Sequence, residues 1–308
     1  MANFTNKDIM KLREQTGVGM MDCKKALIAT DGDFEEAIKY LREKGMASAA
    51  KKASRVAAEG LVNCLVADDK KTAVVLEVNC ETDFVARSEQ FVALVDKLSK
   101  HILTSDAKTV EELLAEQFED GKTGNDLVAE AVASIGEKIS VRRFTKFALD
   151  VDGLIASYIH MGGKIGVLVE IKSAGDKAAL QELAKNLAMQ VAAAKPEFLN
   201  KEDVDPAKLE NEKEILTAQS RNEGKPEAVI EKMVLGRINK YYKEVCLIEQ
   251  EYVRDNSMTI KQVVAECEKA VGCPVTVSAF VRYEMGEGIE KRVDNFVDEI
   301  AEQLKAIQ

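Results

Sequence analysis

The sequence Val-Val-Leu-Glu-Val at residues 74–78 recurs at residues 167–171 as Val-Leu-Val-Glu-Ile. At the same shift of 93 residues, Gly60-Leu61-Val62 aligns with Gly153-Leu154-Ile155. Short apolar runs bounded by turn-forming residues are typical of β-strands. Repetition at a fixed spacing indicates a duplicated structural unit. We therefore expect two related halves of the chain, each built around its own sheet.

The first unit combines strands with helices. Two apolar runs, residues 61–67 and 73–79, flank Asp68-Asp69-Lys70-Lys71, and this pattern predicts a β-hairpin. Helical spacing of the apolar residues follows, before a last strand. The predicted helical segments lie around residues 84–104, 108–118 and 125–135, and the last strand covers residues 139–144. The predicted fold class is therefore α+β, with antiparallel sheets.

The second unit contains an insertion, because the shift between the two copies grows from 93 to 136 residues along the chain. The larger shift places Gly136, Ile139, Val141 and Phe144 over Gly272, Val275, Val277 and Phe280. Within the insertion, Pro206 opens one helix, residues 222–226 form a turn, and a second helix follows. The apolar residues of that second helix recur every three or four positions: Val229, Ile230, Met233, Val234, Ile238, Tyr241 and Tyr242. A helical hairpin at about residues 205–256 is predicted.

The first 55 residues differ from the rest in charge. They hold a net charge of +3, whereas the whole chain carries −10, and this asymmetry favours a separate module. Caps and glycine stops predict three short helices, at residues 6–16, 20–29 and 33–45. In this interpretation Asn6 caps the first helix and Gly45 closes the third, before a helical linker at residues 46–59.

The predicted division of the chain has four parts. They are a three-helix module at residues 1–55, a first α+β half at 56–150, a second half at 151–288 that carries the helical hairpin, and a C-terminal helix at 289–308. The last helix is predicted from one apolar face, made of Ile289, Val293, Phe296, Val297, Ile300 and Leu304.

The composition argues against several classes of protein. An acidic chain is not expected to bind nucleic acid directly, since phosphate binders carry clustered positive charge. Six cysteines without a Cys-x-x-Cys pair, and only two histidines, argue against a zinc site and a disulfide framework. No apolar run is long enough to span a membrane or serve as a signal sequence. We expect a cytoplasmic protein without a metal or cofactor.

Two segments imitate nucleotide-binding loops without meeting the requirements of one. Gly121-Lys122-Thr123 resembles the end of a phosphate loop, but Glu116 stands where the loop requires glycine. Gly162-Gly163-Lys164 fails likewise, with Tyr158 in that place. We expect both segments to be turns, and the chain itself to bind no nucleotide. A catalytic pair of carboxylates stays open as an alternative at this point.

Residues 77–87 read Glu-Val-Asn-Cys-Glu-Thr-Asp-Phe-Val-Ala-Arg, and lead from a strand into a helix. Thr82 or Asp83 can cap that helix. Phe84 either anchors the helix in the core or stands exposed. In the second unit Lys177 takes the place of Phe84, so the duplicated fold does not require an aromatic side chain there. The comparison favours a task for Phe84 that is peculiar to the first half.

Two long motifs resemble the signature segments of the elongation factor Ts family. One is residues 77–87, and the other is residues 12–27, Leu-Arg-Glu-Gln-Thr-Gly-Val-Gly-Met-Met-Asp-Cys-Lys-Lys-Ala-Leu. Shorter matches extend the resemblance nearly end to end: Ser134-Ile135-Gly136, Tyr158-Ile159-His160, Ala194-Lys195-Pro196-Glu197 and Gly286-Glu287-Gly288-Ile289-Glu290-Lys291. The resemblance implies a ubiquitin-associated-like first module, two related α+β halves, a helical hairpin and a C-terminal helix.

The resemblance also implies a function and a set of site residues. It implies a guanine-nucleotide exchange factor, not an enzyme, whose partner is elongation factor Tu in its GDP form. Asp83 and Phe84, flanked by Thr82 and Val85, would form a tip that disturbs the partner's Mg²⁺ and phosphate site. The other implied contact residues are Ile135 and Gly136 beside the tip, His160 in the second half, and Arg13, Met20 and Met21 in the first module.

Local alternatives exist for some of these residues. Met20 and Met21 can instead pack between helices of the first module, and His160 can instead hydrogen-bond within its own turn. An alternative function is a non-catalytic ubiquitin-associated-like binding scaffold or nascent-chain adaptor, which uses only residues 1–55. That function leaves Asp83 and Phe84 unexplained.

Overall fold

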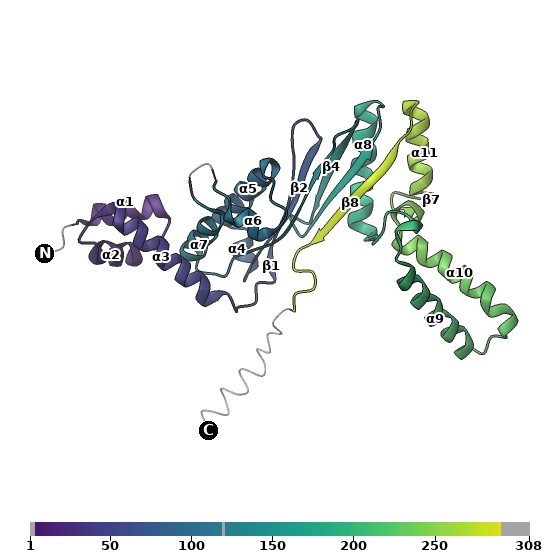
Figure 1. Ribbon diagram of the computed structural model, residues 1–308, viewed down its shortest axis with the longest axis horizontal. Coiled ribbons are helices and arrows are strands. Elements are labelled where there is room, and N and C mark those ends of the chain that lie inside the picture. The colour runs from purple at the N-terminus through teal and green to yellow at the C-terminus, as the bar shows by residue number, and fades with distance from the viewer. Residues whose placement is uncertain (1–3, 119–120, 291–308) are drawn as a thin grey trace, which may run out of the picture.

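The computed structural model describes residues 4–118 and 121–290 and confirms an α+β fold. Figure 1 shows three helices, α1 to α3, at one end of the molecule, and a hairpin of two helices, α9 and α10, at the other. Two antiparallel three-stranded sheets lie between them. Among the described helices, none combines the length and the apolar character that a membrane span requires.

The N-terminal helices are α1 (Asn6–Thr16), α2 (Met20–Ala29) and α3 (Phe34–Lys52). The predicted cap is wrong by one residue, because Thr5 caps α1 and forms a capping box with Asp8. The three helices share an apolar core, made of Ile9, Leu12, Val18, Cys23, Ala26, Leu27, Ala37 and Leu41.

Gly45 does not end the third helix, contrary to the prediction. Helix α3 continues to Lys52, so the first half of the predicted helical linker at residues 46–59 is helical, whereas residues 53 to 58 are not. A Cβ atom at Gly45 would lie 3.3 Å from the backbone oxygen of Ala129 and from the Cβ atom of Ala133. The glycine therefore lets α3 pack closely against helix α7 (Gly124–Ile135) of the first half, instead of stopping α3.

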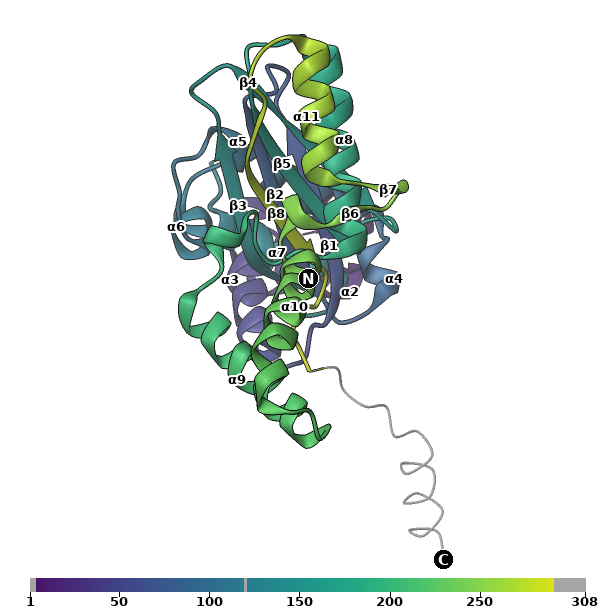
Figure 2. The ribbon, with the colours of Figure 1, turned by 90° about the vertical axis from the view of Figure 1, so that its right-hand side faces the viewer.

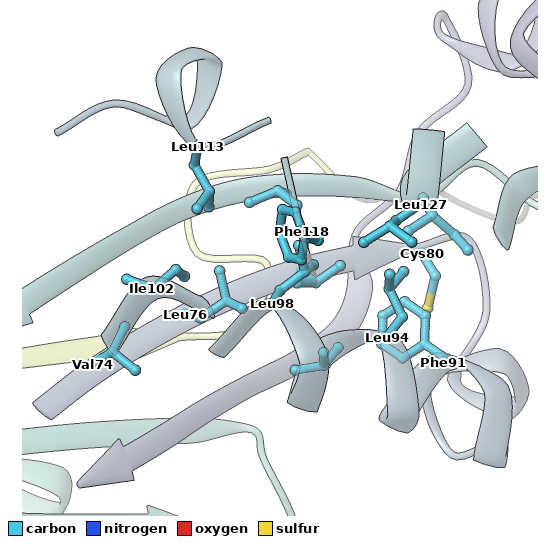
Figure 3. Close-up of a cluster of buried hydrophobic side chains, with 14 of the residues drawn as sticks. Val74, Leu76, Cys80, Phe91, Leu94, Leu98, Ile102, Leu113, Phe118 and Leu127 are labelled. Atoms are coloured by element: carbon cyan, nitrogen blue, oxygen red, sulfur yellow. The ribbon is translucent and has the colours of Figure 1, made fainter. Parts of the chain in front are cut away.

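The first sheet has the strand order β1-β2-β3. Its strands are β1 (Glu59–Val66), β2 (Thr72–Cys80) and β3 (Ser140–Ala148). Between β2 and β3 the chain forms α4 (Asp83–Ala86), α5 (Glu89–Thr104), α6 (Val110–Ala115) and α7. Figure 3 shows the core that joins the sheet to these helices, with Leu76 of β2 close to Leu98 of α5.

The second sheet repeats this arrangement in the order β4-β5-β8. Its strands are β4 (Gly153–His160), β5 (Ile165–Lys172) and β8 (Thr276–Glu284). Helix α8 (Lys177–Ala194) packs on it, and α11 (Ile260–Val271) packs against α8, side by side with it in Figure 2. In both sheets the register shifts at the equivalent place, after Glu77 in β2 and after Glu170 in β5. The two halves thus share strand order, helix positions and a β-bulge.

The two sheets also share an apolar core. Alternate residues of a strand point to opposite faces, so Val74 and Leu76 of β2 contact the helices while Val75 faces the other sheet. Leu168 of β5 and Ile155 of β4 join Val75 in this second cluster. Each sheet therefore buries one face under its own helices and the other face against its counterpart.

The insertion forms α9 (Pro206–Asn222) and α10 (Glu227–Val245), packed through a seam that includes Ile230, Val234 and Ile238. The predicted hairpin is too long at its C-terminal end. Residues after Val245 form a 3₁₀ turn (Leu247–Glu249) and a two-stranded sheet of β6 (Glu251–Tyr252) and β7 (Asp255–Thr259); another 3₁₀ turn (Lys201–Asp203) precedes α9. The predicted C-terminal helix, beyond Glu290, lies outside the described residues.

A buried glutamate connects the two sheets. Glu77 is 0% exposed, and its carboxylate oxygens lie 2.9 Å from Nη1 of Arg142 and 2.6 Å from Nε of Arg143. The backbone N–H of Gly286, just beyond β8, donates to the same carboxylate at 2.8 Å. A buried carboxylate is tolerated only when it is paired and hydrogen-bonded, so these contacts tie β2 and β3 to the end of the second sheet.

An ion pair also attaches the first module to α7. Nε of Arg42 in α3 donates to Oδ1 of Asp126 at 2.8 Å, and Nη2 contacts Oδ2. The N–H and hydroxyl of Thr123 donate to Oδ2 at 2.9 and 2.7 Å. Burial raises the pKa of Asp126, but the hydrogen bonds from Arg42 and Thr123 outweigh burial and lower that pKa to about 2.

Acid should therefore weaken this attachment. Because the folded pKa of Asp126 lies below its unfolded value, the stabilisation is complete above about pH 4 and is lost as the pH falls toward 2. Arg42→Gln should lower the free energy of unfolding by about 1–2 kcal/mol at pH 6 and by less near pH 2.5. Denaturant unfolding of parent and variant across this pH range measures the difference, and a pH-independent difference contradicts the assignment.

Candidate functional site

A four-residue helix, α4, presents the Asp83-Phe84 pair at the end of strand β2. Of the two predicted caps, Thr82 is the one present, because its hydroxyl accepts the backbone N–H of Val85 at 3.3 Å. Asp83 is instead the first helical residue. Its carboxylate lies 3.1 Å from Nη2 of Arg87, in an exposed pair one turn apart, and pairs of this kind contribute little to stability.

The ring of Phe84 stands out from the surface. Phe84 is 83% exposed, whereas Ala86 on the same turn is buried. The interpretation of Phe84 as a core anchor is therefore wrong, as the comparison with Lys177 predicts. A large apolar side chain held in water by a short helix is costly to leave unburied and is available to an apolar pocket on another molecule.

Ile135 and Gly136 lie beside this tip, at the end of α7. Gly136 has a left-handed backbone with φ 90° and ends the helix, a conformation that glycine adopts without strain. The chain then turns so that the carboxylate of Glu137 accepts the backbone N–H groups of Glu81 and Thr82, both at 3.0 Å. Sequence reasoning missed Glu137, although it directly follows the Ile135-Gly136 motif.

The thiol beside the tip is a structural group. Cys80 is buried, and its Sγ donates to the backbone oxygen of Thr82 at 3.1 Å. Burial, together with the nearby charge of Glu137, raises the pKa of Cys80 to about 12. A thiol with such a pKa stays protonated and does not act as a nucleophile.

The other predicted contact residues lie on different elements. Met20 and Met21 at the start of α2 are 46% and 64% exposed, so the interpretation that they pack between helices is wrong. Arg13 on α1 is also exposed. All three belong to the module at one end of Figure 1, away from the β4–β5 turn that carries His160.

His160 ends strand β4 and is exposed. Its Nδ1 lies 3.1 Å from the hydroxyl of Tyr158, and the two rings stack with centroids 5.8 Å apart. His160 therefore does bond locally, but to a residue of its own strand and not of the turn, while its ring stays accessible. Its neighbour Met161, in the turn, is exposed as well.

The segment that imitates a phosphate loop has a structural explanation. Thr123 caps α7 in a capping box with Asp126, and Lys122 lies 2.7 Å from Glu130. A phosphate loop would instead direct successive backbone N–H groups of Gly121 to Thr123 into a cradle before a helix. Within the described ranges, no group of three or more His, Cys, Asp or Glu side chains is arranged to hold a metal ion.

Comparison with known proteins shows the family of this chain. Residues 81–287, which begin at the tip, match the family model described as elongation factor TS. The chain belongs to the elongation factor Ts family.

Three relatives named elongation factor Ts cover nearly the whole chain. The relative from Clostridium botulinum (strain Eklund 17B / Type B) is 54% identical over 298 residues, 97% of this chain and 98% of its own length. Those from Clostridium perfringens (strain SM101 / Type A) and Clostridium novyi (strain NT) are each 52% identical over 97% of this chain and 98% of their own length. Membership of the elongation factor Ts family gives this chain a role in translation elongation.

The exposure of Phe84 predicts how its removal affects folding. Phe84→Ala should change the free energy of unfolding by no more than about 0.5 kcal/mol, since the ring has few contacts to lose. The matched control is Phe91→Ala in α5, where the ring is 0% exposed and its loss should cost about 3–5 kcal/mol. Denaturant unfolding of the two variants measures both free-energy changes. Equal destabilisation by the two substitutions would mean that Phe84 is a core residue.

Proposed function

We propose that this chain binds elongation factor Tu in its GDP form and promotes release of the nucleotide. The chain itself binds neither GDP nor GTP and catalyses no covalent step. The observation that carries the proposal is the exposed ring of Phe84 on a short helix beside the accessible carboxylate of Asp83. A cytoplasmic location follows from this role in translation.

The thermodynamic basis is linkage between two ligands of one partner. A protein displaces GDP only if it binds the empty partner more tightly than the loaded one, and the antagonism is reciprocal. Nucleotide in a GTPase is held by phosphate-loop N–H groups and by Mg²⁺, whose charge dominates its surroundings. A side chain that enters this site and rearranges those groups therefore weakens the binding of GDP.

Phe84 and Asp83 contribute in different ways to this intrusion. Burying the ring of Phe84 in an apolar pocket of the partner provides about 1.5–3 kcal/mol, which offsets part of the lost nucleotide coordination. The carboxylate of Asp83 adds a negative charge whose only described ion pair is the exposed one with Arg87. That charge can reorganise polar groups near the Mg²⁺ site.

Docking on the partner and disturbance of its nucleotide site are assigned to separate surfaces of this chain. Exposed methionines adapt to a partner surface, and Met20 and Met21 stand beside each other at the start of α2. With Arg13 on α1 they form the proposed docking contact with the GTPase domain, while His160 contacts another domain of the partner. Thr82, Val85, Ile135 and Gly136 complete the proposed surface around the tip.

The direct test is the rate of GDP release from elongation factor Tu, followed with a fluorescent GDP. The parent protein should raise the rate, and Phe84→Ala should lower that effect at least tenfold, the equivalent of about 1.4 kcal/mol of lost contact. Direct binding of fluorescent GDP or GTP to the chain alone, or full activity of Phe84→Ala, would count against the proposal.

The docking contact predicts a different kinetic signature. The triple variant Arg13→Ala, Met20→Ala, Met21→Ala should raise the half-saturating concentration about tenfold or more and keep most of the maximal rate, because the tip is intact. Ile215→Ala, which removes an exposed apolar side chain from α9, is the control and should change neither value. If the half-saturating concentration of the triple variant is unchanged, these three residues are not part of the interface.

A further inference from the structure

Two carboxylates hold the tip in a reciprocal clasp. Oε2 of Glu137 accepts the backbone N–H groups of Glu81 and Thr82, both at 3.0 Å. Oε1 of Glu137 accepts the hydroxyl of Thr82 at 2.7 Å. In return, Oε1 of Glu81 accepts the backbone N–H of Lys138 at 2.6 Å. Hydrogen bonds to ionised acceptors are stronger than neutral ones, so the clasp joins two loops that are distant in sequence.

The clasp acts on the residue that orients α4. A helix of one turn has almost no stability of its own, and α4 has only four residues. Its orientation therefore depends on contacts beyond its own backbone, which are the burial of Ala86 in the core and the N-terminal cap, Thr82. The Thr82 hydroxyl donates its proton to Glu137 while it accepts the N–H of Val85. A hydroxyl has one proton to donate, so Glu137 sets the rotation of the cap and with it the direction of Phe84.

The segment that follows α3 is part of the same arrangement. Nη1 of Arg55 lies 3.1 Å from Oε1 of Glu81. Nζ of Lys138 donates to the backbone oxygens of Ala53 and Arg55 at 2.7 and 2.8 Å. These contacts fix Glu81 and Lys138 from the outside, which limits how far either loop can move without the other.

The second half does not contain this clasp. At the shifts that align the two units, Glu81 corresponds to Ala174, Thr82 to Gly175 and Glu137 to Cys273. There, Sγ of Cys273 contacts the hydroxyl of Ser173 at 3.3 Å, and the backbone N–H of Gly175 donates to that hydroxyl at 3.1 Å instead of to a carboxylate. The duplicated fold is therefore complete without a clasp, and the clasp occurs in the half that carries Phe84.

We propose that Glu137 is a positioning residue for nucleotide exchange: it holds the Thr82 cap so that α4 presents Phe84 in one direction before the partner arrives. The proposal rests on the exchange function proposed above. Glu137 acts through Thr82 and not on the nucleotide. Ordering a segment before binding removes an entropic cost at the moment of binding. At saturation, a disordered tip is productive only for the fraction of time it spends in the correct orientation.

The test compares three variants of the full chain. Glu137→Ala removes the clasp. Glu137→Gln keeps one oxygen for the two N–H groups and loses the second acceptor. Glu268→Ala is the matched control, because Glu268 of α11 accepts the N–H of Val275 at 3.1 Å in the equivalent turn of the second half. Hydrogen exchange of the Glu81 and Thr82 amides reports the clasp, and the maximal rate of GDP release reports its effect.

The expected results follow from the geometry. Glu137→Ala should expose the Glu81 and Thr82 amides to exchange and lower the maximal rate about tenfold, a loss equivalent to about 1.4 kcal/mol, without raising the half-saturating concentration comparably. Glu137→Gln should fall between this variant and the parent. Glu268→Ala should keep the parent's rate and the protection of both amides.

Two outcomes overturn the inference. One is a Glu137→Ala protein that loses amide protection at Glu81 and Thr82 yet keeps the parent's maximal rate. The other is unchanged protection of these amides in Glu137→Ala. Both differ from failure of the proposed function, in which the parent protein itself does not accelerate GDP release.

Discussion

The fold depends on a carboxylate with no access to water. Glu77 lies in the middle of β2, at the bulge where its register with β3 shifts, and it is neutralised by Arg142 and Arg143. The same carboxylate accepts the N–H of Gly286 from beyond the other sheet. Removing one partner of a buried pair leaves an uncompensated charge, which costs far more than the pair contributes. The position of β2, the strand that leads to the tip, is thus set by contacts from both halves.

Duplication followed by divergence explains why the exposed tip, α4 with Phe84, lies in only one half. Both units share strand order and a bulge, and the helices α7 and α11 end at equivalent glycines, Gly136 and Gly272. In the second half, the chain runs from β5 into one long helix, α8, capped by Asp176. In the first half a separate single turn, α4, precedes α5 and carries an exposed aromatic ring. The second half has Lys177 at this place, so the fold does not need the ring, and this is why we assign Phe84 to the proposed contact with a partner.

Sequence periodicity predicted most elements because their apolar faces are buried at regular spacing: both sheets, α2 to the residue, and the two helices of the hairpin. The prediction from sequence failed where a tertiary contact, and not local sequence preference, determines the structure. Gly45 has the signature of a helix stop, but its missing side chain serves the packing of α3 on α7. The two-stranded sheet of β6 and β7 is too short to produce a pattern. For the site, exposure of Phe84 followed from comparing the two units, whereas the role of Glu137 depends on a contact 55 residues away in sequence.

The exposed tip is proposed to be complementary to elongation factor Tu without its nucleotide. Linkage makes this proposal quantitative. The factor by which this chain lowers the partner's affinity for GDP must equal the factor by which GDP lowers the partner's affinity for this chain. The most direct measurement is the affinity of the full chain for elongation factor Tu, by titration calorimetry, with the nucleotide absent and with GDP saturating. The chain should bind the empty partner much more tightly than the GDP-bound one, and the ratio of the two affinities should be smaller for Phe84→Ala. Equal affinity for the empty and the GDP-bound partner would contradict it.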